Sequence, residues 1–117
     1  MKLNKIKGAK IMKIKIIIEK DQKGQIGRSG FQIEGRNQKH LKVYIPKVQS
    51  KSTLEELHIM HSCMNAMLYA KHNLKRLKYV LFQLPVMPNV TNEWNVMSKF
   101  NTDIAEKIGC RIEYKRV

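Results

Sequence analysis

Leu77–Leu84 reads LKYVLFQL, a nearly all-apolar run that is followed by Pro85 and Pro88. The run is rich in residues that favour strands, and proline ends strands because it has no backbone N–H to donate. Short apolar runs of this kind are typical of strands that are covered on both faces. We therefore expect this segment to be a central strand, with helices packed against its sheet.

The segment before this strand has the features of a helix. Residues 52–56 read STLEE, which places a hydroxyl N-cap three residues before an acid in either of two registers. We expect the helix to run to about Asn73. Its apolar stripe is expected to consist of Leu57, Met60, Met64, Met67 and Leu68.

The segment after the strand predicts a second helix and a last strand. Apolar side chains recur at helical spacing from Trp94 to Ile104, and residues 107–109 (KIG) supply a cationic last turn and a glycine C-cap. Residues 110–115 (CRIEYK) then alternate between apolar and charged side chains. This alternation is typical of a strand.

The N-terminal third of the sequence predicts three antiparallel strands. In residues 11–18, apolar side chains at even positions alternate with Lys13 and Lys15, so the first strand is expected to have a basic outer face. Residues 21–24 (DQKG) predict a turn to a second strand over about residues 25–34. Another turn leads to a third strand over residues 41–45, which Pro46 stops.

The expected order is therefore strand, strand, strand, helix, strand, helix, strand. A three-stranded meander followed by two crossover units gives an α/β fold with a mixed sheet, and it is the plan of ribonuclease H-like folds. At 117 residues, the chain has the length of one domain. We expect this domain to cover residues 11–117, after a basic extension at residues 1–10 that orders only on an anionic partner.

The chain is strongly basic, with 23 Lys plus Arg against 9 Asp plus Glu and a formal net charge of +14. A net charge of only about 2 to 8 suffices for the solubility of a small domain, and a larger excess attracts polyanions. No apolar run approaches the roughly 18 to 20 residues that span a bilayer, so the sequence predicts no membrane partner. Nucleic acid is the partner class that the charge predicts.

The candidate RNA-binding residues come from the extension, the first three strands with their turns, and the two ends of the first helix. Two hydroxyl residues are included because backbone N–H groups and hydroxyls at a helix start can hold a phosphate. The candidates are Lys5, Lys7, Lys10, Lys13, Lys15, Arg28, Arg36, Lys39, Lys42, Lys47, Lys51, Ser52, Thr53, Lys75 and Arg76.

A metal-dependent ribonuclease H-like nuclease, active or degenerate, is the alternative function. Enzymes of this kind hold two metal ions with carboxylates, and Glu19 or Asp21 together with Glu56 stand at two of the expected places. The expected fourth strand contains no acid. We therefore interpret Asp21 as a turn residue and Glu56 as a helix cap, and we expect no catalytic activity.

The histidines and cysteines predict no metal or cofactor site. His58 and His61 are three residues apart with no third ligand, and we interpret them as residues on the helix surface or facing RNA. Cys63 and Cys110 lack zinc-site spacing and are expected to be reduced and buried. The sequence thus predicts no cofactor, metal or small-molecule substrate.

Four short motifs occur in the order and at the spacing of one known family. Residues 21–26 (DQKGQI) match an Asp-x-x-Gly-x-hydrophobic turn, and residues 50–54 (SKSTL) are similar to Arg-Lys-Ser-Thr-Pro before a helix. Residues 73–79 (NLKRLKY) stand in place of Gly-Ile-Lys-x-Val-x-Val, and residues 109–112 (GCRI) match Gly-hydrophobic-x-Ile. On these motifs, the chain resembles the eleventh small-subunit ribosomal protein family over about residues 11–117.

This resemblance implies a ribonuclease H-like fold and a structural role on the platform of the small ribosomal subunit. The implied partners are small-subunit rRNA and neighbouring ribosomal proteins. The family's glycine- and proline-rich loop is replaced by residues 84–88 (LPVMP), a departure that an organellar ribosome tolerates better because neighbouring proteins can take over contacts. The expected location is therefore the ribosome, mitochondrial rather than cytoplasmic. A free-standing nucleic-acid-binding protein is a further alternative.

Overall fold

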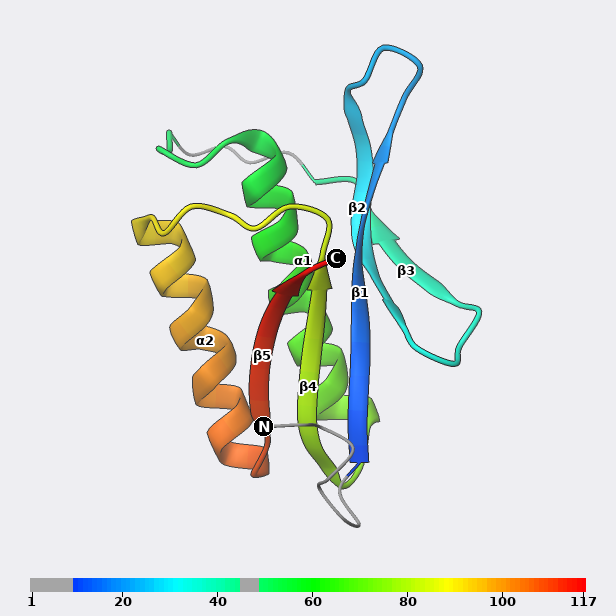
Figure 1. The fold of residues 1–117 in the computed structure, drawn as a ribbon, viewed down its shortest axis with the longest axis vertical. Coiled ribbons are helices and arrows are strands. Elements are labelled where there is room, and N and C mark those ends of the chain that lie inside the picture. Colours follow the sequence, from blue (N-terminus) through cyan, green and yellow to red (C-terminus); the bar gives the residue numbers. More distant parts are fainter. Residues whose placement is uncertain (1–9, 45–48) are drawn as a thin grey trace.

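The structure is a computed structural model that describes residues 10–44 and 49–117. Within these residues, the chain forms five strands and two helices (Figure 1). In chain order they are β1 (Lys10–Lys20), β2 (Ile26–Ile33), β3 (Lys39–Lys42), α1 (Leu54–Asn73), β4 (Leu77–Leu84), α2 (Asn92–Ile108) and β5 (Arg111–Arg116).

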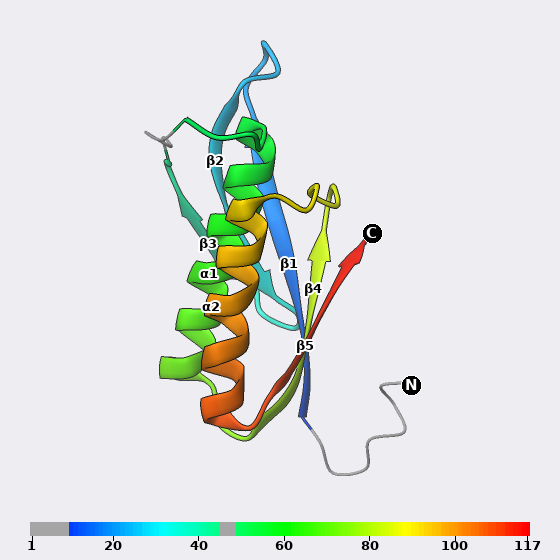
Figure 2. The ribbon, with the colours of Figure 1, turned by 90° about the vertical axis from the view of Figure 1, so that its left-hand side faces the viewer.

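The five strands form one mixed sheet in the order β3-β2-β1-β4-β5. β1 is antiparallel to β2, and β2 is antiparallel to β3. β4 is parallel to both β1 and β5, and helix α2 connects the β4–β5 pair along the chain. The expected mixed α/β class is confirmed, and β4 is an internal strand of the sheet as its apolar sequence predicts. The expected cover on both of its faces is not provided by the helices, which lie on one face (Figure 2).

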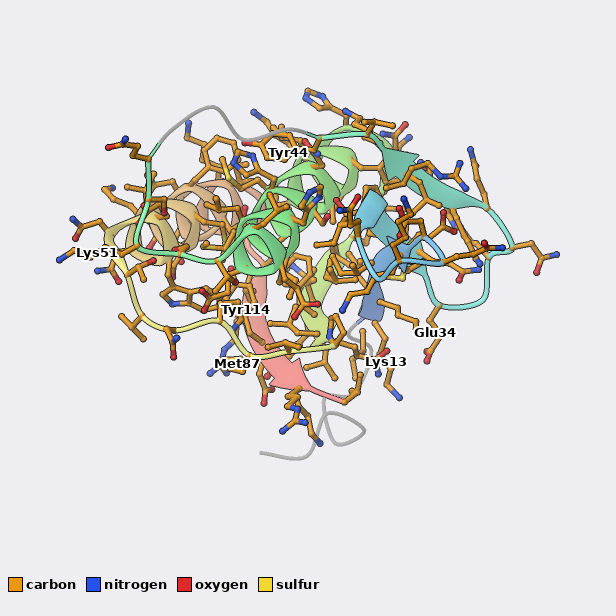
Figure 3. All side chains as sticks on the ribbon, turned by 90° about the horizontal axis from the view of Figure 1, so that it is seen from above. Lys13, Glu34, Tyr44, Lys51, Met87 and Tyr114 are labelled. Atoms are coloured by element: carbon orange, nitrogen blue, oxygen red, sulfur yellow. The ribbon has the colours of Figure 1, made fainter. Side chains whose placement is uncertain are left out.

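Both helices pack against the same face of the sheet, so the described part of the chain forms two layers (Figures 1 and 2). Alternation along β1 determines which side chains meet the helices: Ile14 and Ile16 are buried, whereas Lys15 between them is exposed. Seen from above, Lys13 and Glu34 lie on the side of the sheet away from α1 (Figure 3). We call this side the helix-free face.

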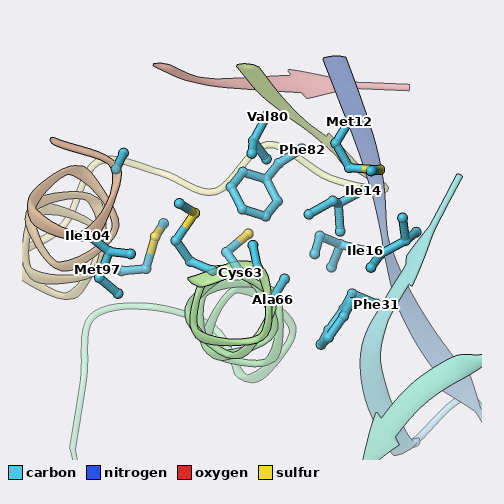
Figure 4. Close-up of a cluster of buried hydrophobic side chains, with 14 of the residues drawn as sticks. Met12, Ile14, Ile16, Phe31, Cys63, Ala66, Val80, Phe82, Met97 and Ile104 are labelled. Carbon is cyan, nitrogen blue, oxygen red and sulfur yellow. The ribbon is translucent and has the colours of Figure 1, made fainter. Parts of the chain in front are cut away.

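The hydrophobic core lies between the sheet and the two helices (Figure 4). Val80, Phe82 and Leu84 of β4 are completely buried in it, and each such side chain contributes about 1.5–3 kcal/mol of hydrophobic free energy. The free cysteines Cys63 and Cys110 are buried, as expected. Burial raises the pKa of the Cys110 thiol to about 11 and that of Cys63 further.

Local turn and cap chemistry follows the sequence closely. Thr53 is the N-cap of α1, and the Glu56 side chain completes the capping box, which decides between the two registers that the sequence allowed. Gly109 ends α2 in the left-handed conformation, with φ of 71°. Asp21 Oδ1 accepts hydrogen bonds from the backbone N–H groups of Lys23 (2.8 Å) and Gln25 (2.9 Å).

Some details differ from the expectations. β1 begins at Lys10, which was expected to belong to the N-terminal extension. β3 ends at Lys42, whereas the sequence predicted a strand that continues to Ile45 and stops at Pro46. Ile45 and Pro46 lie outside the described residues. Leu68 was expected in the apolar stripe of α1, but it is 37% exposed. Leu68 instead lines a surface hollow together with Phe31 and His40.

Gly30 marks a close approach between β2 and β3. A Cβ atom at this position would lie 1.8 Å from the carbonyl oxygen of His40, which is far inside van der Waals contact. Only glycine lets the two backbones come this close. The edge strand β3 therefore depends on Gly30 for its position.

Candidate nucleic-acid interface

The helix-free face carries a row of long polar side chains that crosses all five strands. In the register of the sheet, Lys15 of β1 pairs with Gln32 of β2 and with Gln83 of β4. Gln32 pairs in turn with Lys39 of β3, and Gln83 pairs with Lys115 of β5. Strands lie roughly 4.8 Å apart, so the three lysines recur about every 10 Å across the sheet. We call these five residues the lysine row.

A hollow of about 270 Å³ lies on the same face, beside the row. Its wall includes Lys15, Gln32 and Gln83 of the row, and the β2–β3 turn adds Arg36. The amide of Gln32 donates hydrogen bonds to the carbonyl oxygens of Arg36 (2.9 Å) and Asn37 (3.3 Å), which fixes the turn beside the hollow. The full lining is Lys13, Lys15, Gln32, Ile33, Glu34, Gly35, Arg36 and Gln83, with three cations and one acid.

The acids of this face contact partners within the protein. Glu34 lies 3.8 Å from the ammonium of Lys13, and Glu113 accepts a hydrogen bond of 2.5 Å from the hydroxyl of Tyr79, which raises the pKa of that tyrosine. Both partners of the Lys13–Glu34 pair are well exposed, and such a pair contributes only about 0–1 kcal/mol. A phosphate group could therefore displace Glu34 from Lys13 at small cost.

The structure brings three of the predicted RNA-binding residues together on this face: Lys13, Lys15 and Lys39. Arg36 lines the hollow from the β2–β3 turn, but its guanidinium Nη1 lies 3.5 Å from the hydroxyl of Tyr69 on α1. Lys115 belongs to the same row, although the sequence did not single it out. It was missed because its neighbours in the row are more than thirty residues away in sequence. The alternation of residues 110–115 did indicate that this lysine faces away from the core.

The other predicted RNA-binding residues lie outside the row and its hollow. Arg28, the register partner of Glu19, also faces the helix-free side, but it lies near the β1–β2 turn and donates to Glu19 from two nitrogens, at 2.9 and 2.7 Å. Lys42 points to the opposite face of β3 from Lys39. Lys75 and Arg76 are exposed in the segment between α1 and β4. Lys10 is the first residue of β1, whereas Lys5, Lys7 and Lys47 lie outside the described residues.

The predicted phosphate site at the start of α1 is built from groups that already have partners. The hydroxyl of Ser52, a buried residue, lies 2.8 Å from that of Thr91, and the backbone N–H of Thr53 donates to Glu56 at 2.7 Å. Glu56 also accepts from the N–H of Asn89 at 2.6 Å. The hydrogen bonds from Thr53 and Asn89 lower the pKa of Glu56. The N–H groups of Thr53 and Asn89 therefore already donate to a carboxylate within the protein.

Lys51 shares this end of the molecule with another acid. It lines an open hollow together with Glu93 of α2, whose carboxylate accepts a hydrogen bond from the hydroxyl of Ser50. That hydrogen bond is the main cause of a lowered Glu93 pKa, and Lys51 contributes by its charge. The starts of the two helices are thus less favourable for RNA than the helix-free face.

The three carboxylates of the alternative function have structural contacts. Glu19 pairs with Arg28, Asp21 closes the β1–β2 turn, and Glu56 caps α1. Across residues 10–44 and 49–117, no three His, Cys, Asp or Glu side chains come close enough together to hold a metal ion.

The interpretation of His58 as a surface residue is wrong. Its side chain is 1% exposed, and its Nδ1 atom lies 2.6 Å from the hydroxyl of Ser29 on β2. Burial, together with the charge of the nearby His61, lowers the pKa of His58. His61 is partly exposed, and its Nε2 lies 2.7 Å from the Tyr44 hydroxyl. Local sequence patterns could not predict these contacts, because both partners precede the helix by many residues.

No known family, curated protein or solved structure matches this chain. Within the described ranges, neither helix is long and apolar enough to cross a membrane.

Proposed function

We propose that this protein is a structural component of the small ribosomal subunit and binds rRNA through the helix-free face of its sheet. The observation that carries this proposal is the lysine row with its adjoining hollow. A net charge of +14 would attract RNA to any part of the surface. The row adds geometry, because three lysines and two amides lie in register across the sheet without an acid among them.

The chemistry of the row suits a phosphate backbone. Lysine ammonium groups on long flexible stems neutralise phosphates and release counterions, and the amide of Gln83 can donate to phosphate oxygens or to the 2′-hydroxyl of ribose. The amide of Gln32 instead donates to the carbonyl oxygens of Arg36 and Asn37. Lys13 extends the basic surface to the hollow. These contacts position an RNA strand without reading its sequence. That is the behaviour expected of a protein held at one place by the surrounding assembly.

The proposal includes a ribonuclease H-like topology. Three features support it: the order of elements along the chain, the position of β1 between β2 and β4, and the packing of both helices on one face. The resemblance of the turn, cap and strand motifs to the eleventh small-subunit ribosomal protein family supports the ribosomal role. Neighbouring ribosomal proteins as further partners and a mitochondrial ribosome as the location belong to the same proposal. The nuclease alternative gains no support from the contacts of Glu19, Asp21 and Glu56.

Sedimentation of the native assembly tests this function. The chain, tagged and expressed at its natural level, is expected to travel with small ribosomal subunits and intact rRNA in a density gradient, and to remain bound at moderate salt. A merely polycationic protein is stripped off under these conditions. A chain that sediments free of rRNA, or that cleaves an RNA–DNA hybrid with Mg²⁺ in a manner abolished by Glu56→Gln, contradicts the proposal.

A further inference from the structure

A second hollow of about 270 Å³ lies between α1 and the β2–β3 edge of the sheet. Phe31 and His40 supply its strand side, and Tyr69 supplies its helix side. Because His40 is the register partner of Phe31, whose side chain is in the core, it points toward the helix layer, away from the lysine row. The lining is Ser29, Gly30, Phe31, His40, Lys42, Asn65, Leu68, Tyr69, His72 and Asn73. We call this hollow the aromatic groove.

Three rings form a mutually contacting cluster in the groove. The rings of Phe31 and His40 are stacked, with centroids 4.7 Å apart and planes inclined by 10°. Tyr69 lies 4.5 Å from His40 and 5.6 Å from Phe31 in tilted orientations. Phe31 is buried and forms the floor, whereas His40 and Tyr69 are partly exposed. The groove therefore offers partly exposed aromatic surface that packs on the buried ring of Phe31.

Polar and cationic groups surround this aromatic surface. Asn65 provides an amide, Lys42 and His72 stand among the lining residues, and Arg36 Nη1 lies 3.5 Å from the Tyr69 hydroxyl. The lining contains no acid. An aromatic surface with an amide and cations at its margin is the combination by which proteins hold an unpaired base, with stacking on the ring and charge for the phosphate.

We propose that the aromatic groove binds an unpaired nucleobase of the RNA, stacked on the partly exposed rings of His40 and Tyr69, with Lys42 contacting the adjoining phosphate. This inference rests on the proposed RNA-binding function and specifies its ligand as a single-stranded element. Paired RNA presents no free base face, so a regular duplex would leave the groove unused. The lysine row, by contrast, accepts backbone from paired or unpaired RNA.

Two short single-stranded RNAs of equal length and charge test the inference, one complete and one with abasic sites along its centre. The wild-type protein is expected to bind the complete strand more tightly, because stacking of one base contributes about 5- to 150-fold in affinity. Tyr69→Ala is expected to lower affinity for the complete strand and to leave affinity for the abasic strand unchanged. Tyr69→Phe, which keeps the ring, is the matched control and is expected to preserve the discrimination.

Ultraviolet cross-linking of the wild-type protein keeps the test independent of whether Tyr69→Ala folds. Cross-linked bases are expected on His40 or Tyr69. Equal affinity of the wild type for the two strands, or cross-links confined to other parts of the chain, overturns the inference while leaving the lysine row intact. Failure of the wild type to bind either strand at low salt instead contradicts the proposed function itself, so the two failures are distinguishable.

Discussion

Replacing two lysines of the row should change the salt dependence of RNA binding in a way that other lysines do not. Lys15 and Lys115 lie on the helix-free face, are exposed, and form no ion pair within the described ranges. We therefore expect both ammonium groups to be available to phosphates. The double variant Lys15→Gln, Lys115→Gln keeps the length and polarity of the side chains and removes only the two charges.

The size of the effect follows from counterion release. Each lysine that neutralises a phosphate of a single strand contributes about 0.7 to the slope of log affinity against log salt, so the double variant should lose about 1.4 from the slope. Over a fourfold rise in salt, from about 50 to about 200 mM, the ratio of wild-type to variant affinity should then shrink about sevenfold. Exposed substitutions of this type change the free energy of unfolding by less than about 0.5 kcal/mol.

The measurement is a fluorescence anisotropy titration of a labelled single-stranded RNA at several salt concentrations. The matched control is the double variant Lys99→Gln, Lys107→Gln, which removes the same charge from α2. Both lysines are exposed, and Lys99 has only an exposed i,i+4 pair with Asp103 to lose. The control should retain most of the wild-type slope.

Equal losses of slope in the two double variants would refute the reasoning. In that case the positive excess would act as a diffuse field over the whole surface, and the register of the lysine row would have no bearing on binding. A row variant with the wild-type slope would show that RNA contacts another face.

Three further predictions concern stability. Gly30→Ala should lower the free energy of unfolding by about 1–3 kcal/mol, because the new Cβ would lie 1.8 Å from the carbonyl oxygen of His40 and β3 must move. A urea titration measures this change, and an unchanged midpoint would contradict the close approach. Thr53→Ala should lower the free energy of unfolding by about 1 kcal/mol because the N-cap of α1 is lost. Thr53→Ser, which keeps the hydroxyl, should retain most of this stability. Burial lowers the pKa of His58 below the ordinary value of 6.5, so the unfolded state takes up the proton before the folded state as the pH falls. The contribution of neutral His58 to the free energy of unfolding should therefore be fully present above about pH 6.5 and decrease as the pH falls toward the folded-state pKa. The pH dependence of the urea midpoint should be shallower in His58→Gln, and an identical profile would assign it to other groups.

The sequence predicted the elements of the fold well because their signals are local. The apolar run of β4, the capping box at Thr53 and the glycine C-cap at Gly109 each act within a few residues, and each lies where it was expected. The strand β3 was placed less well. It is a short edge strand positioned by the close contact at Gly30, which is a tertiary feature that no local pattern records.

The candidate site could be predicted only in part, for the same reason. Alternation in β1 showed that Lys13 and Lys15 face outward, but the lysine row depends on the register between strands that are distant in sequence. Shifting one strand by a single residue would move its member of the row to the opposite face. The buried position of His58 depends likewise on how α1 packs over β2, since its partner Ser29 lies twenty-nine residues earlier.

The two binding surfaces meet at β3, and this constrains the path of an RNA strand that uses both. Lys39 belongs to the lysine row and His40 to the aromatic groove, and adjacent residues of a strand point to opposite faces of a sheet. An RNA chain that contacts both must therefore pass around the β3 edge. β3 is the edge strand of the sheet, so no further strand lies in this path.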